Sequence, residues 1–281
     1  MCILFIHSEN SPPPGKYKLV LASNRDESYR RPAKYAHYWD EDSSVFGGRD
    51  MEPGREGGTW LGMSKCGKIG VLLNVLMPTV YPNPSSRGFL VANFLKMPIS
   101  GGFEYLTNLM NEGKQYTHFN MIAIDVRQTE IKVNHYSNAG NQKPETLPNG
   151  LLGFGNSSLE KPFQKVTEGK KMFSKIISNY GTKEYKDVLV DELMAFLKCK
   201  TSYYPDHNIL EQVPNISDEK HKMHSSLYAE SLGLNYGTRT HTVILVDHEN
   251  QVDFVEWTME EPINPENPTW MKHQTSFKLN F

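Results

Sequence analysis

The chain has 281 residues, a formal net charge of −2, and 38% hydrophobic and 11% aromatic residues. This near-neutral balance gives no electrostatic reason to expect a nucleic-acid partner. No stretch approaches the roughly 20 apolar residues that a membrane-spanning helix needs. The spacings of Cys2, Cys66 and Cys199 fit neither a disulfide framework nor a zinc site, and they suit a reducing compartment. The ten histidines show no metal-ligand pattern. We therefore expect a cytoplasmic protein with no transmembrane segment, no metal and no required cofactor.

The first part of the chain predicts two hairpins. The apolar residues 3–6 predict a buried strand, the ENSPPPG segment at 9–15 predicts a turn, and the alternating residues 16–22 predict an antiparallel return strand. This hairpin would bring the polar segment SNRDES, residues 23–28, back to the start of the chain. Residues 57–75 predict a second hairpin with its turn at 64–67, and residues 77–87 predict a loop.

Strands are also predicted near the other end of the chain, with helices in between. The helices are expected at 88–96, 103–110, 172–177 and 188–197, and the strands at 118–126, 130–136, 151–155, 240–247 and 252–257. Residues 277, 279 and 281 also alternate as apolar positions. This order predicts an α+β fold with mainly antiparallel sheet, in a single domain over residues 1–281.

Cys2 is the first candidate for chemistry. If Met1 is removed, the α-amino group of Cys2 becomes free, and its pKa of about 7.7–8.0 lets it accept the thiol proton. The alternative is that Cys2 is a small apolar residue that begins a core strand.

The SNRDES segment is the second candidate. Four strongly polar residues after an apolar strand are costly to bury unless they satisfy one another. Arg25 between Asp26 and Glu27 could orient a substrate or the N-terminal amine through charge-assisted hydrogen bonds. A solvated strand end is the alternative.

Two asparagines and a late arginine follow or precede apolar strands. Asn74 comes after residues 70–73 and Asn156 after residues 151–155, so either amide could stabilise a developing oxyanion. Arg239 precedes a strand and could bind a carboxylate or phosphate. As alternatives, each asparagine could be a turn residue and Arg239 could cap a surface loop.

Taken in order, the motifs resemble those of the NRDE family of transport and Golgi organisation proteins. They are MC at the start, NRDE at 24–27, GGTWLG at 57–62, FNMIAID at 119–125, GFGNSSLEKPFQK at 153–165 and YGTRTHTVILVD at 236–247. The resemblance implies a fold like that of N-terminal-nucleophile hydrolases. That fold is a four-layer αββα sandwich with two mainly antiparallel sheets.

The resemblance also implies site residues. By analogy with the cysteine amidases of that fold, Cys2 stands at the nucleophile position and Asp26 at the position that contacts the N-terminal amine. Asn74 and Asn156 stand at oxyanion positions, and Arg239 falls near a late active-site arginine. The chain differs in having Ser23 where the amidases usually have an arginine. The residues expected to contact a ligand are Asn24, Arg25, Glu27, Trp60 and Arg239.

Two functions are compatible with this resemblance. The family's links to haem mobilisation, acyl-lipid handling and secretory organisation imply a carrier of a hydrophobic small molecule. The cargo would be haem or acyl-CoA, with transient association with organelle membranes of the Golgi or mitochondria. The alternative is a Cys2-dependent hydrolase of an amide or thioester bond.

Overall fold

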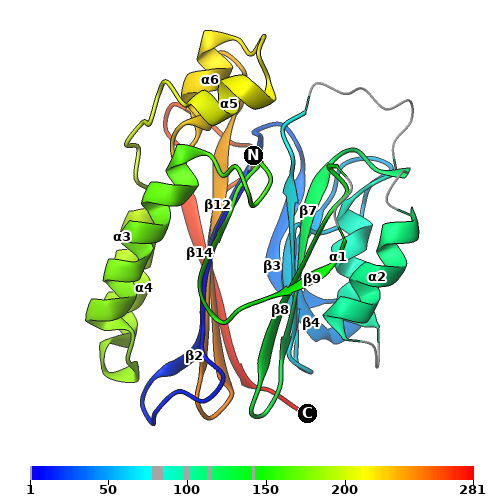
Figure 1. Ribbon diagram of the computed structural model, residues 1–281, viewed down its shortest axis with the longest axis vertical. Coiled ribbons are helices and arrows are strands. Elements are labelled where there is room, and N and C mark those ends of the chain that lie inside the picture. Colours follow the sequence, from blue (N-terminus) through cyan, green and yellow to red (C-terminus); the bar gives the residue numbers. More distant parts are fainter. Residues whose placement is uncertain (1, 78–84, 98–100, 113–114, 141–142) are drawn as a thin grey trace.

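Two antiparallel sheets packed face to face form the centre of the molecule, and helices cover the outer face of each sheet (Figure 1). The computed structural model describes residues 2–77, 85–97, 101–112, 115–140 and 143–281. The expected αββα sandwich with two mainly antiparallel sheets is confirmed.

The first sheet contains both strands of the N-terminal hairpin. Its order is β10-β1-β2-β12-β13-β14, with β11 paired to β12. Its strands are β1 (Ile3–Ser8), β2 (Tyr17–Ser28), β10 (Gly150–Phe154), β11 (Glu230–Ser231), β12 (Tyr236–Asp247), β13 (Gln251–Met259) and β14 (Trp270–Lys278).

The second sheet follows the chain from strand to neighbouring strand, in the order β3-β4-β5-β6-β7-β8-β9. Its strands are β3 (Ala33–Trp39), β4 (Asp42–Asp50), β5 (Leu61–Ser64), β6 (Lys68–Asn74), β7 (Phe119–Val126), β8 (Ile131–Ser137) and β9 (Glu145–Leu147).

The helices divide between the two sheets. Helices α1 (Gly88–Lys96) and α2 (Gly102–Glu112) cover the second sheet, and α3 (Gln164–Tyr180), η2 (Lys183–Tyr185) and α4 (Lys186–Leu197) lie on the side of the first. Helices α5 (His207–Gln212) and α6 (Asp218–His224) lie at one end of the sandwich (Figure 1). Within the described part of the chain, no helix is both long and apolar enough to cross a membrane.

Strand β1 is apolar on both faces because it separates two cores. Leu4 and Ile6 pack in the core between the sheets, whereas Ile3 and Phe5 pack against the helical layer. Helix α3 approaches closely at Gly169, where a Cβ atom would lie 2.4 Å from the Phe5 ring. A further core fills the space between the second sheet and α1 and α2.

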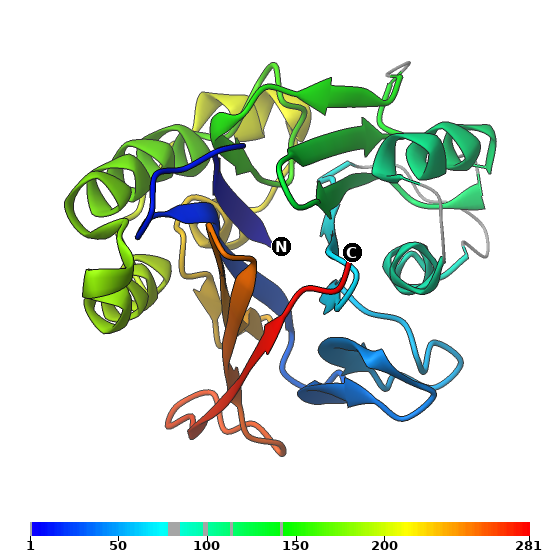
Figure 2. The same ribbon diagram turned by 90° about the horizontal axis from the view of Figure 1, so that it is seen from below.

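The C-terminal segment connects the two sheets at the end of the sandwich opposite the start of β1 (Figures 1 and 2). Leu279 is buried in the core between the sheets. Its backbone N–H donates to Asn250 of the first sheet's β12–β13 turn, and the Asn280 N–H donates to Lys65 of the β5–β6 turn.

The sequence-based strand boundaries were wrong in several places. The strand predicted to end at residue 22 continues to Ser28, because β12 pairs with the NRDE segment throughout. Strands β3 and β4 were not predicted, and the alternation at residues 277–281 marked only the end of β14. Of the predicted loop 77–87, residues 78–84 lie outside the described residues.

Candidate active site

A polar pocket lies where the start of β1 meets the end of β6 and the beginning of α1. It has a volume of about 90 Å³. Cys2, Arg25, Asp26, Glu27, Trp60 and Asn74 line it, together with Arg31, Asp50, Arg55, Thr59, Leu72, Ser86, Arg87 and Gly88. Six of the residues selected from the sequence therefore meet in one pocket.

Cys2 is half-buried and packs at the edge of the core between the sheets. The antiparallel register, with Ile3 opposite Asn24, brings Cys2 beside Arg25 and Asp26. The Asp26 backbone lies beside the Cys2 sulfur in this register. Burial raises the pKa of the Cys2 thiol, and the Asp26 carboxylate adds to this rise, while the Asp26 N–H and Arg25 oppose it. The thiol therefore needs a base to become a nucleophile at neutral pH.

The Asp26 carboxyl is buried, and its Oδ1 accepts a 2.6 Å hydrogen bond from the Thr238 hydroxyl. Burial raises the pKa of Asp26, whereas Lys165 and the Thr238 hydrogen bond oppose the rise. Lys165 is fully buried and donates to the Ser226 carbonyl at 3.1 Å. Burial lowers the pKa of Lys165, and Asp26 and Cys2 act against that. Lys165 was missed from the sequence, although it ends the GFGNSSLEKPFQK motif.

Arg25 stacks on Trp60, with its guanidinium carbon 3.9 Å from the ring centroid. The side chain is 5% exposed, and its Nη1 has no hydrogen-bond partner among the described residues. Glu27 lies 3.8 Å from Arg31, which also holds Asp50 through two bonds of 3.0 and 2.7 Å.

The two asparagines selected from the sequence have different positions. Asn74 lines the pocket at the end of β6. Asn156 is buried and does not line it; instead its Nδ2 donates at 2.6 Å to the Asn74 carbonyl. Asn156 therefore fixes the strand end that carries Asn74.

Asn24 and Arg239 also lie outside the pocket. Asn24 faces the helical layer, where its Nδ2 donates to the carbonyls of Leu197 and Leu227 at 2.8 and 3.0 Å. Its Oδ1 must then accept from Nδ1 of His241, at 2.6 Å. Arg239 sits at a register shift between β12 and β2 and donates to the Ser28 and Arg31 carbonyls and to Glu261. These two side chains hold β2 and the turn after it.

Several pocket residues had no signal in the sequence. Arg31, Asp50, Arg55 and Arg87 come from separate turns and strands that only the tertiary fold brings together. None belongs to a spacing pattern of known chemistry.

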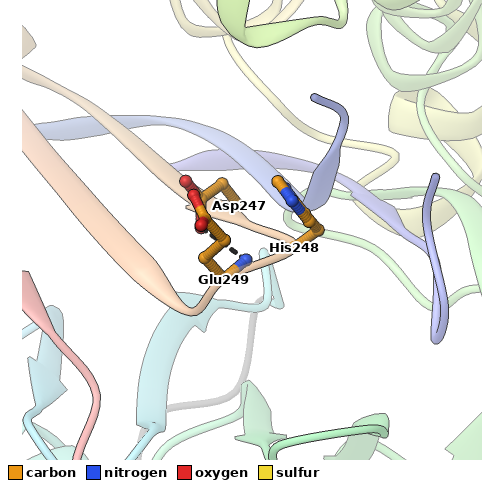
Figure 3. Close-up of side chains that lie close together, drawn as sticks. All are labelled: Asp247, His248 and Glu249. Carbon is orange, nitrogen blue, oxygen red and sulfur yellow. Dashed lines mark hydrogen bonds between the residues drawn. The ribbon is translucent and has the colours of Figure 1, made fainter. Parts of the chain in front are cut away.

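Asp247, His248 and Glu249 form a close acidic group on the β12–β13 turn (Figure 3). The dashed line in Figure 3 is the 2.8 Å bond from the Glu249 N–H to the Asp247 carboxylate, which shapes the turn. Lys183 already contacts Asp247 and Glu249 at 2.6 and 2.8 Å. The Lys183 ammonium thus bridges the two carboxylates and offsets one of their two charges, and we assign no metal to this group.

Comparison with known proteins agrees with the motifs. Residues 1–261 match the family described as "Transport and Golgi organisation 2". The chain belongs to this family. It is 36% identical over 281 residues to the mouse transport and Golgi organization 2 homolog, covering 99% of both chains. It is 37% identical to the Drosophila melanogaster protein, covering 92% of each.

Solved structures with a related arrangement are more distant from this member of the Transport and Golgi organisation 2 family. A Caenorhabditis elegans N-acylethanolamine-hydrolyzing acid amidase ortholog aligns with a TM-score of 0.39 and 10% identity, over 87% of this chain and 92% of that one. A variant of conjugated bile acid hydrolase from Clostridium perfringens aligns with a TM-score of 0.43 and 11% identity, over 99% and 97%.

Proposed function

We propose that the protein is a Cys2-dependent hydrolase of an amide or thioester bond. The observation that carries this proposal is the convergence of the Cys2 sulfur, the Asp26 backbone N–H and Asn74 at one pocket. A nucleophile, a donor that favours its thiolate and a candidate oxyanion donor are three of the groups that acyl transfer uses, and the α-amino group of Cys2 would supply the base.

The reaction requires removal of Met1, so that Cys2 carries a free α-amino group. The amine takes the thiol proton, and the sulfur attacks the substrate carbonyl carbon to form a tetrahedral oxyanion, which the Asn74 amide stabilises. Collapse breaks the bond to nitrogen or sulfur, and the leaving group takes the proton from the ammonium. Water, deprotonated by the same amine, then cleaves the thioester and releases a carboxylic acid and the Cys2 thiol.

The surrounding residues have supporting roles in this proposal. Asp26 orients the amine, and Thr238 and Lys165 keep its buried carboxyl in place. Asn156 positions Asn74 through the strand end. Arg239 holds the backbone after β2, on which the wall of the pocket is built.

Intact mass and acyl transfer test the hydrolase. We expect mass spectrometry to show loss of Met1, and a panel of acyl p-nitroanilides and thioesters to give burst release that disappears in Cys2→Ala. Asn74→Ala should lower kcat by about 10²–10³-fold, while Cys66→Ala serves as the matched control and retains turnover. Full retention of Met1, or turnover that survives in Cys2→Ala, would contradict the proposal.

A carrier function has a separate observation in its favour. A cavity of about 500 Å³ lies between β10 and α3, with mainly apolar walls that include Leu151, Leu152 and Phe154 and with Lys170 and Lys171 beside them. Its volume is typical of small-molecule sites. The described residues that line it include no His, Cys, Tyr or Met to ligate haem iron, so we propose an acyl chain, such as that of acyl-CoA, rather than haem.

Titration separates this carrier function from the hydrolase. We expect saturable binding of a long-chain acyl-CoA that Leu152→Asp weakens and Cys2→Ala leaves unchanged. If neither acyl-CoA nor haem binds saturably, the carrier function is excluded.

The relatives are named for transport and Golgi organization. We propose that this protein acts in the cytoplasm and associates transiently with Golgi or mitochondrial membranes, and these names support the Golgi part of the proposal. Fractionation of tagged protein, with and without acyl-CoA depletion, tests this.

A further inference from the structure

The pocket beside Cys2 has an excess of positive charge on the side that α1 contributes. Its acidic side chains are already engaged: Asp50 is held by Arg31, Glu27 accepts from the Ser28 N–H at 2.8 Å and lies near Arg31, and Asp26 accepts from Thr238. By contrast, Arg25, Arg55 and Arg87 line the same pocket and form no ion pair with a carboxylate of the described residues.

Arg25 is the residue that points most strongly to anion binding in this pocket. It is 5% exposed, and its Nη1 makes no hydrogen bond to any described residue. The buried carboxyl of Glu256 interacts with Arg25 electrostatically but is hydrogen-bonded to the Ala36 N–H. A buried guanidinium without a carboxylate partner is costly, and Arg25 lines the pocket, so an anion there would compensate its charge.

Helix α1 adds a second source of positive potential. Its N-cap residue is Arg87, which offers no side-chain cap, so the first N–H groups of the nine-residue helix are not capped by that side chain. Gly88 lets this end of α1 pack closely against the backbone at Gly58, since a Cβ atom on Gly88 would lie 3.1 Å from the Gly58 Cα. Arg87 donates to the His118 carbonyl at 2.8 Å, and burial and the neighbouring Arg55 lower its pKa to about 10 against the opposing effect of Glu27. An anion between Arg55 and Arg87 would relieve the repulsion between them.

We infer that Arg25, Arg55, Arg87 and the N-terminus of α1 form an anion-binding subsite, and that the substrate carries a carboxylate or phosphate close to its scissile carbonyl. This inference names a substrate class for the same pocket and in that respect rests on the proposed hydrolase. The subsite itself, however, depends only on the geometry of the arginines. The pocket volume of about 90 Å³ suits a small anionic group beside the reacting carbonyl.

Alkylation of Cys2 measures the subsite without requiring turnover. Iodoacetate and iodoacetamide are nearly the same size and differ in charge, and each forms a sulfur–carbon bond with loss of iodide. Peptide mass spectrometry gives the rate at Cys2 and, as references in the same chain, at Cys66 and Cys199. We expect the iodoacetate-to-iodoacetamide rate ratio to be at least about tenfold higher at Cys2 than at Cys66. This is the effect expected if one charge-assisted hydrogen bond holds the carboxylate of iodoacetate beside Cys2.

Variants assign the effect to the arginines. Arg55 is exposed in a turn, so Arg55→Met should fold normally and lower the ratio at Cys2. Arg127→Met is the matched control, because Arg127 follows β7 at the opposite strand end from Phe119 and Asn74. It should leave the ratio at Cys2 unchanged, and Cys199 is the reference for this variant because Arg127 donates to the Cys66 carbonyl at 3.5 Å. A Cys2 ratio equal to that of Cys66, or one insensitive to Arg55→Met, would overturn the subsite.

Competing anions identify the chemistry that the subsite prefers. Acetate and inorganic phosphate are added at constant ionic strength, and slower alkylation of Cys2 by either supports the subsite and ranks carboxylate against phosphate. As a measurement independent of thiol reactivity, the favoured anion should raise the Tm of the wild type but not of Arg55→Met. If neither anion slows the alkylation of Cys2 and neither raises the Tm of the wild type, the inference is refuted. If Met1 is retained but the charge preference persists, the hydrolase fails and the subsite stands.

Discussion

Glu256 is a buried carboxyl that joins the two sheets. It lies on β13 of the first sheet with 1% of its surface exposed, and its Oε1 accepts from the Ala36 N–H of β3 in the second sheet at 2.7 Å. Burial raises the pKa of Glu256 from 4.5 to about 7, against the opposing effects of this hydrogen bond and of Arg25. The protonated form is therefore favoured by the fold.

The pH dependence of stability follows from this shift. The folded state binds the Glu256 proton more tightly than the unfolded state, so this residue's contribution to stability falls as pH rises from about 4.5 to about 7. Glu256→Gln keeps the acceptor for Ala36 and removes the titration. Urea unfolding should show the variant gaining about 3 kcal/mol relative to wild type between pH 4 and pH 8. An equal difference at both pH values would contradict the assignment.

At this scale the sequence predicted part of the site. The hairpin of residues 3–22 was sufficient to bring Cys2 near Arg25 and Asp26. The sequence could not show that pairing with β12 extends β2 to Ser28. Because of this extension the side chains alternate: Arg25 faces the pocket and Asn24 faces the helical layer. The sequence could not show that Lys165 is buried near the site, because its partners Asp26 and Ser226 come from distant parts of the chain.

The β5–β6 turn requires glycine at position 67 for two reasons, its backbone conformation and its close packing against β7. Gly67 has φ of +87°, and a Cβ atom there would lie 2.2 Å from the Val126 carbonyl oxygen. That carbonyl belongs to β7, and the Val126 N–H donates back to Gly67. The turn therefore packs directly on its neighbouring strand.

Two glycine variants separate backbone strain from crowding. Gly54 has φ of +78°, and a Cβ atom added there would meet no other atom within 4 Å, so Gly54→Ala should cost only about 1 kcal/mol. Gly67→Ala adds a steric clash and should cost about 2 kcal/mol more. Denaturant unfolding of both proteins measures the difference, and equal costs would show that the β5–β6 turn can move away from Val126.

Strand prediction succeeded where strands alternate or are continuously apolar. The second hairpin and the strands β7, β8, β12 and β13 were found for this reason. Strands β3 and β4 were missed because two register shifts interrupt their pairing and hence their alternation. Strand β14 is an edge strand whose residues are mostly polar and half-exposed, so its pairing with β13 is what defines it.

On the scale of the whole molecule, the C-terminal segment stabilises the packing of one sheet on the other. Leu279 is 5% exposed in the core between the sheets, whereas Phe281 is 55% exposed. Leu279→Ala should lower the free energy of unfolding by about 2–3 kcal/mol, and Phe281→Ala by less than about 1 kcal/mol. Chemical denaturation followed by both tryptophan fluorescence and circular dichroism tests this. A small effect of Leu279→Ala would mean that the sheets hold together without this connection.

The two chain ends lie at opposite ends of the sandwich (Figure 1), and the pocket is lined by Cys2 beside the N-terminal end. A fusion partner or surface linker joined after Phe281 would therefore leave the pocket open. The exposed ring of Phe281 shows that the chain there has room for the junction. A tag ahead of Cys2 would block the amine that the proposed chemistry uses and would crowd the arginines. Recombinant protein with an N-terminal tag should thus appear inert even if the native protein is an active hydrolase, whereas a C-terminally tagged chain should not.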